Sequence, residues 1–106
     1  MMKMEDLKQL YYLRREATEC LKSLHELEKC PGTDEIRGII AERMRRVEEQ
    51  RDRLEAYIYA IEDHFTRSVF VLRFEHLMNW KQIAARVGGN EGSLRAMTRR
   101  YILKHP

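Results

Sequence analysis

A chain of 106 residues has the size of one small domain, or of one domain with a helical extension. Its residues are 43% hydrophobic and 35% charged, which is too apolar for a disordered chain and too charged for a membrane protein. The net charge is +3, no apolar run approaches the roughly 18 residues that span a bilayer, and residues 1–10 lack a signal-peptide pattern, so we expect a cytoplasmic protein.

The first predicted helix runs from about Met4 to Lys29. Its apolar face consists of Leu7, Leu10, Ala17, Leu21, Leu24 and Leu27. The sequence Cys30-Pro31-Gly32 ends this helix because proline cannot continue a helix and glycine permits the turn. Cys20 and Cys30 would be about 15 Å apart on one helix, beyond the roughly 7 Å that a disulfide tolerates, so we expect reduced packing residues and no metal site.

Thr33 is the expected cap of a second helix, with Asp34 and Glu35 in its first turn, where the helix dipole favours acids. Apolar residues recur along this helix at seven-residue spacing, with others between them, although Arg51 interrupts the intermediate row. They are Ile40, Val47, Leu54 and Ile61, with Ile36, Met44 and Ile58 in between. Residues 1–60 are therefore predicted to form an antiparallel helical hairpin that acts as a scaffold, a spacer or an oligomerisation arm.

Asp63 is the expected N-cap of a third helix, which extends from His64 to about Leu77. Its predicted apolar face consists of Phe65, Val69, Leu72 and Leu77, with Phe74 nearby. Asn79 is expected to cap a short fourth helix, with Gln82 completing a capping box. Trp80, Ile83, Ala84 and Val87 form the predicted buried side of that helix.

Gly88 is expected to end the fourth helix in a left-handed conformation, and Asn90 to begin the last one after a tight turn. Leu94, Met97 and Tyr101 form the predicted inner face of the last helix. This spacing of apolar residues, a small residue and a glycine is typical of a helix-turn-helix. The predicted fold is therefore all-α, with a DNA-binding helix-turn-helix domain of three helices over residues 61–106.

The charges are divided unevenly along the chain. Residues 1–60 hold 12 basic and 13 acidic side chains, whereas residues 61–106 hold 8 and 4. From Asn79 onward, six basic residues face a single acid, Glu91. A surface of one sign at the end of the chain indicates a polyanionic partner.

If Leu94, Met97 and Tyr101 point inward, the helical period turns a second set of side chains outward. We expect base contacts in the major groove from Asn90, Gly92, Ser93, Arg95, Ala96 and Arg99. Phosphate contacts are expected from Lys81, Arg86, Arg100 and Lys104.

Residues 61–88, I-E-D-H-F-T-R-S-V-F-V-L-R-F-E-H-L-M-N-W-K-Q-I-A-A-R-V-G, resemble region 4 of bacterial sigma factors. The whole chain is similar to small prophage-encoded, sigma-region-4-like transcriptional regulators of Gram-positive bacteria, most clearly over residues 57–103. The resemblance implies a regulator that binds promoter DNA, with RNA polymerase as a further partner. The chain lacks anything like the sigma parts that melt a promoter, so it is not expected to initiate transcription alone.

Other functional classes stay open. Phage small terminase subunits also join a helix-turn-helix to helical oligomerisation segments, and a helical adaptor without enzymatic activity fits the same pattern. The hairpin is also the expected site of any homodimer. The four histidines are scattered and no serine or cysteine has a recognisable base beside it, so we expect no enzyme and no cofactor.

Overall fold

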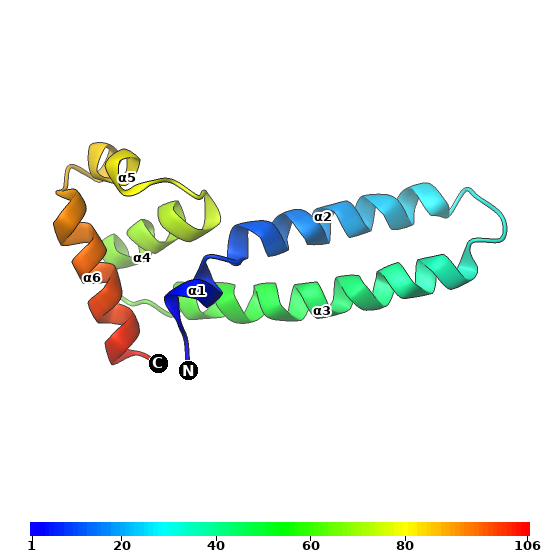
Figure 1. Cartoon of the computed structure of the whole chain (residues 1–106), viewed down its shortest axis with the longest axis horizontal. Coiled ribbons are helices and arrows are strands. Elements are labelled where there is room, and N and C mark those ends of the chain that lie inside the picture. Colours follow the sequence, from blue (N-terminus) through cyan, green and yellow to red (C-terminus); the bar gives the residue numbers. More distant parts are fainter. The chain divides into compact units, whose positions relative to one another are not determined.

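The computed structural model describes residues 1–106 and is entirely helical, without strands, as the sequence predicts (Figure 1). Its elements are α1 (Met4–Leu7), α2 (Leu10–Leu27), α3 (Asp34–Tyr59), α4 (His64–Phe70), the π-helical turn η1 (Val71–Glu75), α5 (Trp80–Val87) and α6 (Glu91–Lys104). None of these helices is both long and apolar enough to cross a membrane.

The chain divides into two compact units. The middle unit is Tyr12–Arg53, and the terminal unit combines Met1–Tyr11 with Leu54–Pro106. The sequence predicted one boundary at residue 60, but the first eleven residues group with the C-terminal part. Leu7 and Leu10 explain this grouping because both side chains are fully buried.

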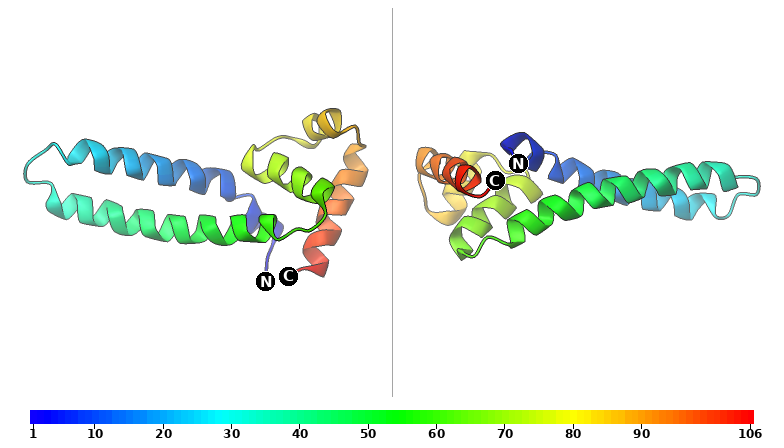
Figure 2. Two further views of the ribbon diagram at one scale, coloured as in Figure 1. Left: turned by 180° about the vertical axis from the view of Figure 1, so that it is seen from behind. Right: turned by 90° about the horizontal axis from the view of Figure 1, so that it is seen from below.

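In the middle unit, α2 and α3 run antiparallel, side by side (Figures 1 and 2). The buried residues between them are few and small: Ala17, Cys20 and Val47. The prediction that Leu21 and Ile36 pack in this seam is wrong, since their side chains are 61% and 52% exposed. Ala17 and Cys20 are three residues apart on one face, and Leu21, one residue further on, is rotated about 100° away from Cys20.

The predicted first helix is interrupted at Lys8 and Gln9, where the Gln9 N–H donates to the Asp6 carbonyl at 3.1 Å. The later turn between α2 and α3 falls where proline and glycine predict it. There, Thr33 precedes α3, and its hydroxyl lies 2.8 Å from the Cys30 carbonyl and 3.0 Å from the Leu27 carbonyl. Cys30 itself is exposed, so it is not the packing residue that the sequence suggested.

In the terminal unit, α4 begins at the predicted cap. The Asp63 carboxylate accepts hydrogen bonds from the Thr66 hydroxyl at 2.7 Å and from the Thr66 N–H at 2.9 Å. These two bonds lower the pKa of Asp63 because they stabilise its charged form. The cap therefore fixes where α4 begins.

The predicted third helix ends earlier than expected because its last turn is π-helical. The His76 N–H donates to the Val71 carbonyl, five residues back, and Leu77 has a left-handed φ of 56°. The core of this region also differs in part from the prediction. Phe65 and Leu77, which the sequence placed on the apolar face, are 45% and 41% exposed, whereas Phe70 and Phe74 are buried.

Candidate nucleic-acid interface

Both helices of the candidate interface begin at the asparagines that the sequence predicts. The Asn79 side chain accepts the Gln82 N–H at 2.8 Å, and the Gln82 side chain accepts the Asn79 N–H at 3.0 Å, which completes the predicted capping box. At the start of α6, the Asn90 side chain accepts the Ser93 N–H at 3.1 Å. Two side-chain caps therefore set where α5 and α6 begin.

The two glycines between these helices do different things. Gly88 ends α5 with a φ of 75° and a ψ of 30°, a left-handed conformation that costs other residues about 1–2 kcal/mol. At Gly89 space is tight, because a Cβ atom there would lie 3.2 Å from Leu94 Cδ1 and the leucine side chain would have to shift by a few tenths of an ångström. The sequence predicts the first role, whereas the second depends on where α6 packs.

α5 and α6 share one apolar cluster with α4. Its buried members are Val69, Trp80, Ile83 and Leu94. The Arg73 guanidinium lies 4.9 Å from the centre of the Trp80 ring and donates to the Met78 carbonyl at 2.9 Å. Arg73 thus fixes the segment that leads into α5, which holds α5 at one place on α4.

The inner face of α6 is wider than predicted. Leu94 is buried, but Thr98 and Ile102 are the other buried residues, while Met97 and Tyr101 are half-buried. Thr98 tolerates burial because its hydroxyl donates to the Leu94 carbonyl at 2.9 Å. The sequence pattern missed Thr98 because only apolar residues were expected in the core.

Aromatic residues fix the end of α6. The Tyr57 hydroxyl donates to the His105 carbonyl at 2.7 Å, and the Tyr57 ring meets the Tyr101 ring edge-on at 6.0 Å. Burial, together with the neighbouring Tyr101, raises the pKa of Tyr57 to about 12. Burial also raises the pKa of Tyr101. Both ends of α6 are therefore held, one by the Asn90 cap and one by this aromatic contact.

All six residues expected to contact bases are exposed on α6 or at its cap. They are Asn90, Gly92, Ser93, Arg95, Ala96 and Arg99. The Asn90 side chain and the Ser93 N–H are engaged in the cap, so Asn90 is less free to contact a ligand than the sequence suggested. Gly92, Ala96 and the two arginines form the exposed outer side of the helix.

The residues expected to contact phosphates are exposed as well: Lys81, Arg86, Arg100 and Lys104. Together with Arg95 and Arg99, they are the six cations that follow Asn79. None of the six forms an ion pair or donates a side-chain hydrogen bond within the protein. No ion pair within the protein therefore neutralises these six charges.

Arg73 is a further cation of this region that the sequence did not predict as a base or phosphate contact. Partial burial and the nearby charge of Arg95 lower its pKa. The effect of Arg95 shows that α6 and η1 bring like charges close together. Arg73 is the central residue of the Leu-Arg-Phe motif at residues 72–74, which contributes to the family resemblance and could have indicated this cation.

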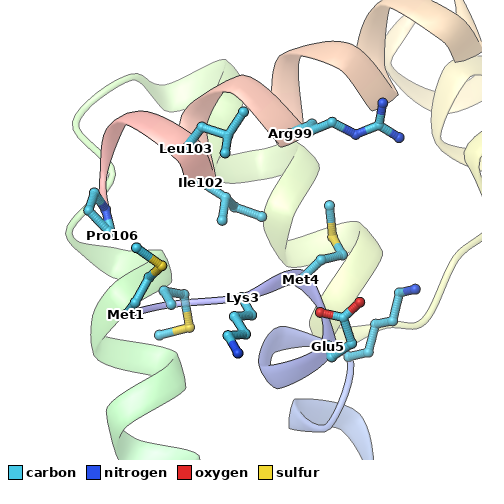
Figure 3. Close-up of a pocket in the computed structure, with 10 residues that line it drawn as sticks. Met1, Lys3, Met4, Glu5, Arg99, Ile102, Leu103 and Pro106 are labelled. Atoms are coloured by element: carbon cyan, nitrogen blue, oxygen red, sulfur yellow. The ribbon is translucent and has the colours of Figure 1, made fainter.

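Lys3 and Lys8 were also not predicted as contact residues, because they are about 90 residues away from α6 in the sequence. Figure 3 shows the N-terminal segment across from the last two turns of α6. The two lysines line one pocket with Arg99. The Met2 N–H donates to the Pro106 carbonyl at 3.0 Å, which joins the two ends of the chain. No motif indicates this proximity.

No group of three or more His, Cys, Asp or Glu side chains comes close enough together anywhere in the chain to hold a metal ion. The sequence matches no family model, no curated protein and no solved structure. Inference about function therefore rests on the geometry and charge of α5 and α6.

Proposed function

We propose that this protein is a sequence-specific DNA-binding transcriptional regulator in which α5 and α6 act as a helix-turn-helix. The observation that carries the proposal is the set of six exposed cations on α5 and α6 that have no acidic partner. A cluster of basic side chains on one pair of helices is the electrostatic footprint expected of a protein that binds the phosphates of double-stranded DNA.

In this proposal, α6 lies in the major groove with its N-terminal half against the bases. Gly92 and Ala96 are small and exposed, so the helix backbone can approach the base edges closely. Arg95 and Arg99 are one turn apart and can each donate two hydrogen bonds to a guanine. These two arginines would select the sequence.

The remaining cations would hold the protein on the DNA backbone. Lys81 and Arg86 lie on α5, while Arg100 and Lys104 lie on the C-terminal half of α6. Contacts of this kind supply affinity and orientation but do not discriminate between base pairs. The caps at Asn79 and Asn90 support this role because they fix the helices that carry the cations.

The test compares Arg95→Ala with Lys81→Ala on two DNAs, a site selected from a random library and a scrambled duplex. Arg95→Ala should lose about 1–3 kcal/mol of binding free energy on the selected site only. Lys81→Ala should weaken binding to both DNAs equally. Lys22→Ala, an exposed lysine of α2, is the matched control and should change neither.

Circular dichroism of each variant checks that the helices are intact, since Arg95, Lys81 and Lys22 are all exposed. If Arg95→Ala and Lys81→Ala lose affinity in the same proportion on both DNAs, α6 does not read bases. If the unmodified protein binds neither DNA, the proposed function is wrong.

A further inference from the structure

A pocket of about 460 Å³ lies between the N-terminal segment and the end of α6 (Figure 3). The pocket shares only Arg99 with the proposed DNA contact. Its apolar walls come from Met1, Met2 and Met4 on one side and from Ile102 and Leu103 on the other. A volume of this size accommodates several side chains of a partner.

The apolar wall is open to solvent at two points. Leu103 is 74% exposed and Met1 is 93% exposed, although both line the pocket. Isolated apolar side chains are common on surfaces, but these two continue an apolar pocket. Apolar surface that extends from a pocket onto its rim is typical of protein-binding sites. Three methionines in one wall add to this, because flexible, polarizable side chains adapt to the side chains of a partner.

The charge around the pocket selects the kind of partner. Lys3, Lys8 and Arg99 line it, and Glu5 is the one acidic side chain in the lining. Three cations against one acid favour a ligand that carries negative charge around an apolar centre. In Figure 3, Glu5 belongs to the N-terminal wall, while Arg99 lies on the opposite wall, on α6.

We propose that this pocket is a docking site for an acidic amphipathic helix of a partner protein. Apolar side chains of that helix enter between the methionines and Leu103, and its carboxylates pair with Lys3, Lys8 and Arg99. The recognition follows the helix-in-groove mode, in which residues at i, i+3, i+4 and i+7 are the anchors. Charge complementarity sets the orientation and the rate of binding.

The test uses a synthetic peptide of about 14 residues, roughly 21 Å as a helix, with leucine at the anchor positions and glutamate elsewhere. The readout is the NMR signal of the methionine ε-methyl groups in the full-length protein. The signals of Met1, Met2 and Met4 should shift as peptide is added. Those of Met44 and Met78, which are outside the pocket lining, should not.

Two matched pairs of variants locate the contact. Leu103→Asp should weaken peptide binding about tenfold or more, whereas Leu21→Asp, on a leucine that is 61% exposed in α2, should not. The double variant Lys3→Glu/Lys8→Glu should also weaken binding, and Lys22→Glu/Lys29→Glu should not. All six substituted residues are exposed, so each variant is expected to fold.

Three outcomes would overturn the proposal. One is an equal loss of binding in Leu103→Asp and Leu21→Asp. Another is equal binding of a peptide in which lysine replaces every glutamate. The third is that decanoate shifts the Met1, Met2 and Met4 signals whereas the acidic peptide does not, which would make the pocket a small-molecule site. No DNA is present in these experiments, so their outcome is separate from that of the DNA-binding test.

Discussion

The middle unit and the end of the terminal unit use charge in opposite ways. In the middle unit, arginines meet acids on the same helix or on its neighbour, as in Arg43 with Glu16 at 2.7 Å. Arg45 and Arg46 hold the pKa of Glu42 at about 2 through hydrogen bonds and charge. On α5 and α6, by contrast, six cations have no such partner. The first surface is neutralised by ion pairs within the protein, and the second is not.

The two units also differ in how much core they have. The middle unit buries Ala17, Cys20 and Val47, whereas the other twelve buried hydrophobic residues belong to the terminal unit. Surface ion pairs contribute only about 0–1 kcal/mol each, so they do not replace a core. The unit with the unpaired cations is therefore the one with the larger core, which is consistent with the proposed recognition role.

The largest effect that would test this contrast is the loss of a core aromatic ring. Phe70 is fully buried, and its ring lies 5.4 Å from that of Tyr101. Phe70→Ala should reduce the free energy of unfolding by about 3–5 kcal/mol. Leu21→Ala in the middle unit should change it by less than about 0.5 kcal/mol because Leu21 is mostly exposed. Urea unfolding followed by circular dichroism measures both, and similar losses would show that the middle unit has a larger core than described.

Glycine-to-alanine substitutions should change the stability of the protein in opposite directions in the two units. Gly88→Ala should destabilise the protein by about 1–2 kcal/mol because its φ is 75°. Gly38→Ala in α3 should stabilise it by about 0.5–1 kcal/mol, since a methyl group there meets nothing within 4 Å and alanine favours the helix. The midpoint of thermal unfolding should fall for Gly88→Ala and rise for Gly38→Ala. Stabilisation by Gly88→Ala would mean that the turn before α6 is not left-handed.

Alkaline pH should destabilise the protein through Tyr57 in the terminal unit. Its pKa of about 12 lies above the ordinary value near 10, so the folded protein keeps a proton that the unfolded chain releases. The stabilisation from this proton is complete below about pH 10 and is lost as the pH rises toward 12. Tyrosinate absorbance in the folded protein should therefore show a late step, which Tyr57→Phe removes. A single step near pH 10 for all tyrosines would contradict the burial of Tyr57.

The sequence predicted the features that depend on neighbouring residues. The caps at Asp63, Asn79 and Asn90 and the left-handed Gly88 each need only a few adjacent residues, and all four are present. The helical class of the whole chain was predicted for the same reason. Exposure of the candidate contact residues on α6 also follows from local periodicity.

The errors concern features that depend on distant parts of the chain. Leu77, just after the π-helical turn, is exposed rather than buried, and no local pattern distinguishes that turn from an ordinary helix. Leu21 and Cys20 were both expected to pack, yet only Cys20 is buried, because the position of α3 decides which side of α2 is covered. The N-terminal segment beside α6 was missed because the contact joins opposite ends of the chain.

The central claim is that the unpaired cations of α5 and α6 bind DNA. The dependence of DNA affinity on salt concentration tests this claim most directly. With four phosphate contacts, log K should fall with log salt with a slope of about −3.6 between about 50 and 200 mM. Replacing Lys81, Arg86, Arg100 and Lys104 by alanine should remove most of that slope. Replacing the paired Arg43, Arg45 and Arg46 should leave it unchanged. An affinity for DNA that does not depend on salt, or a slope that falls only in the second variant, would contradict the account.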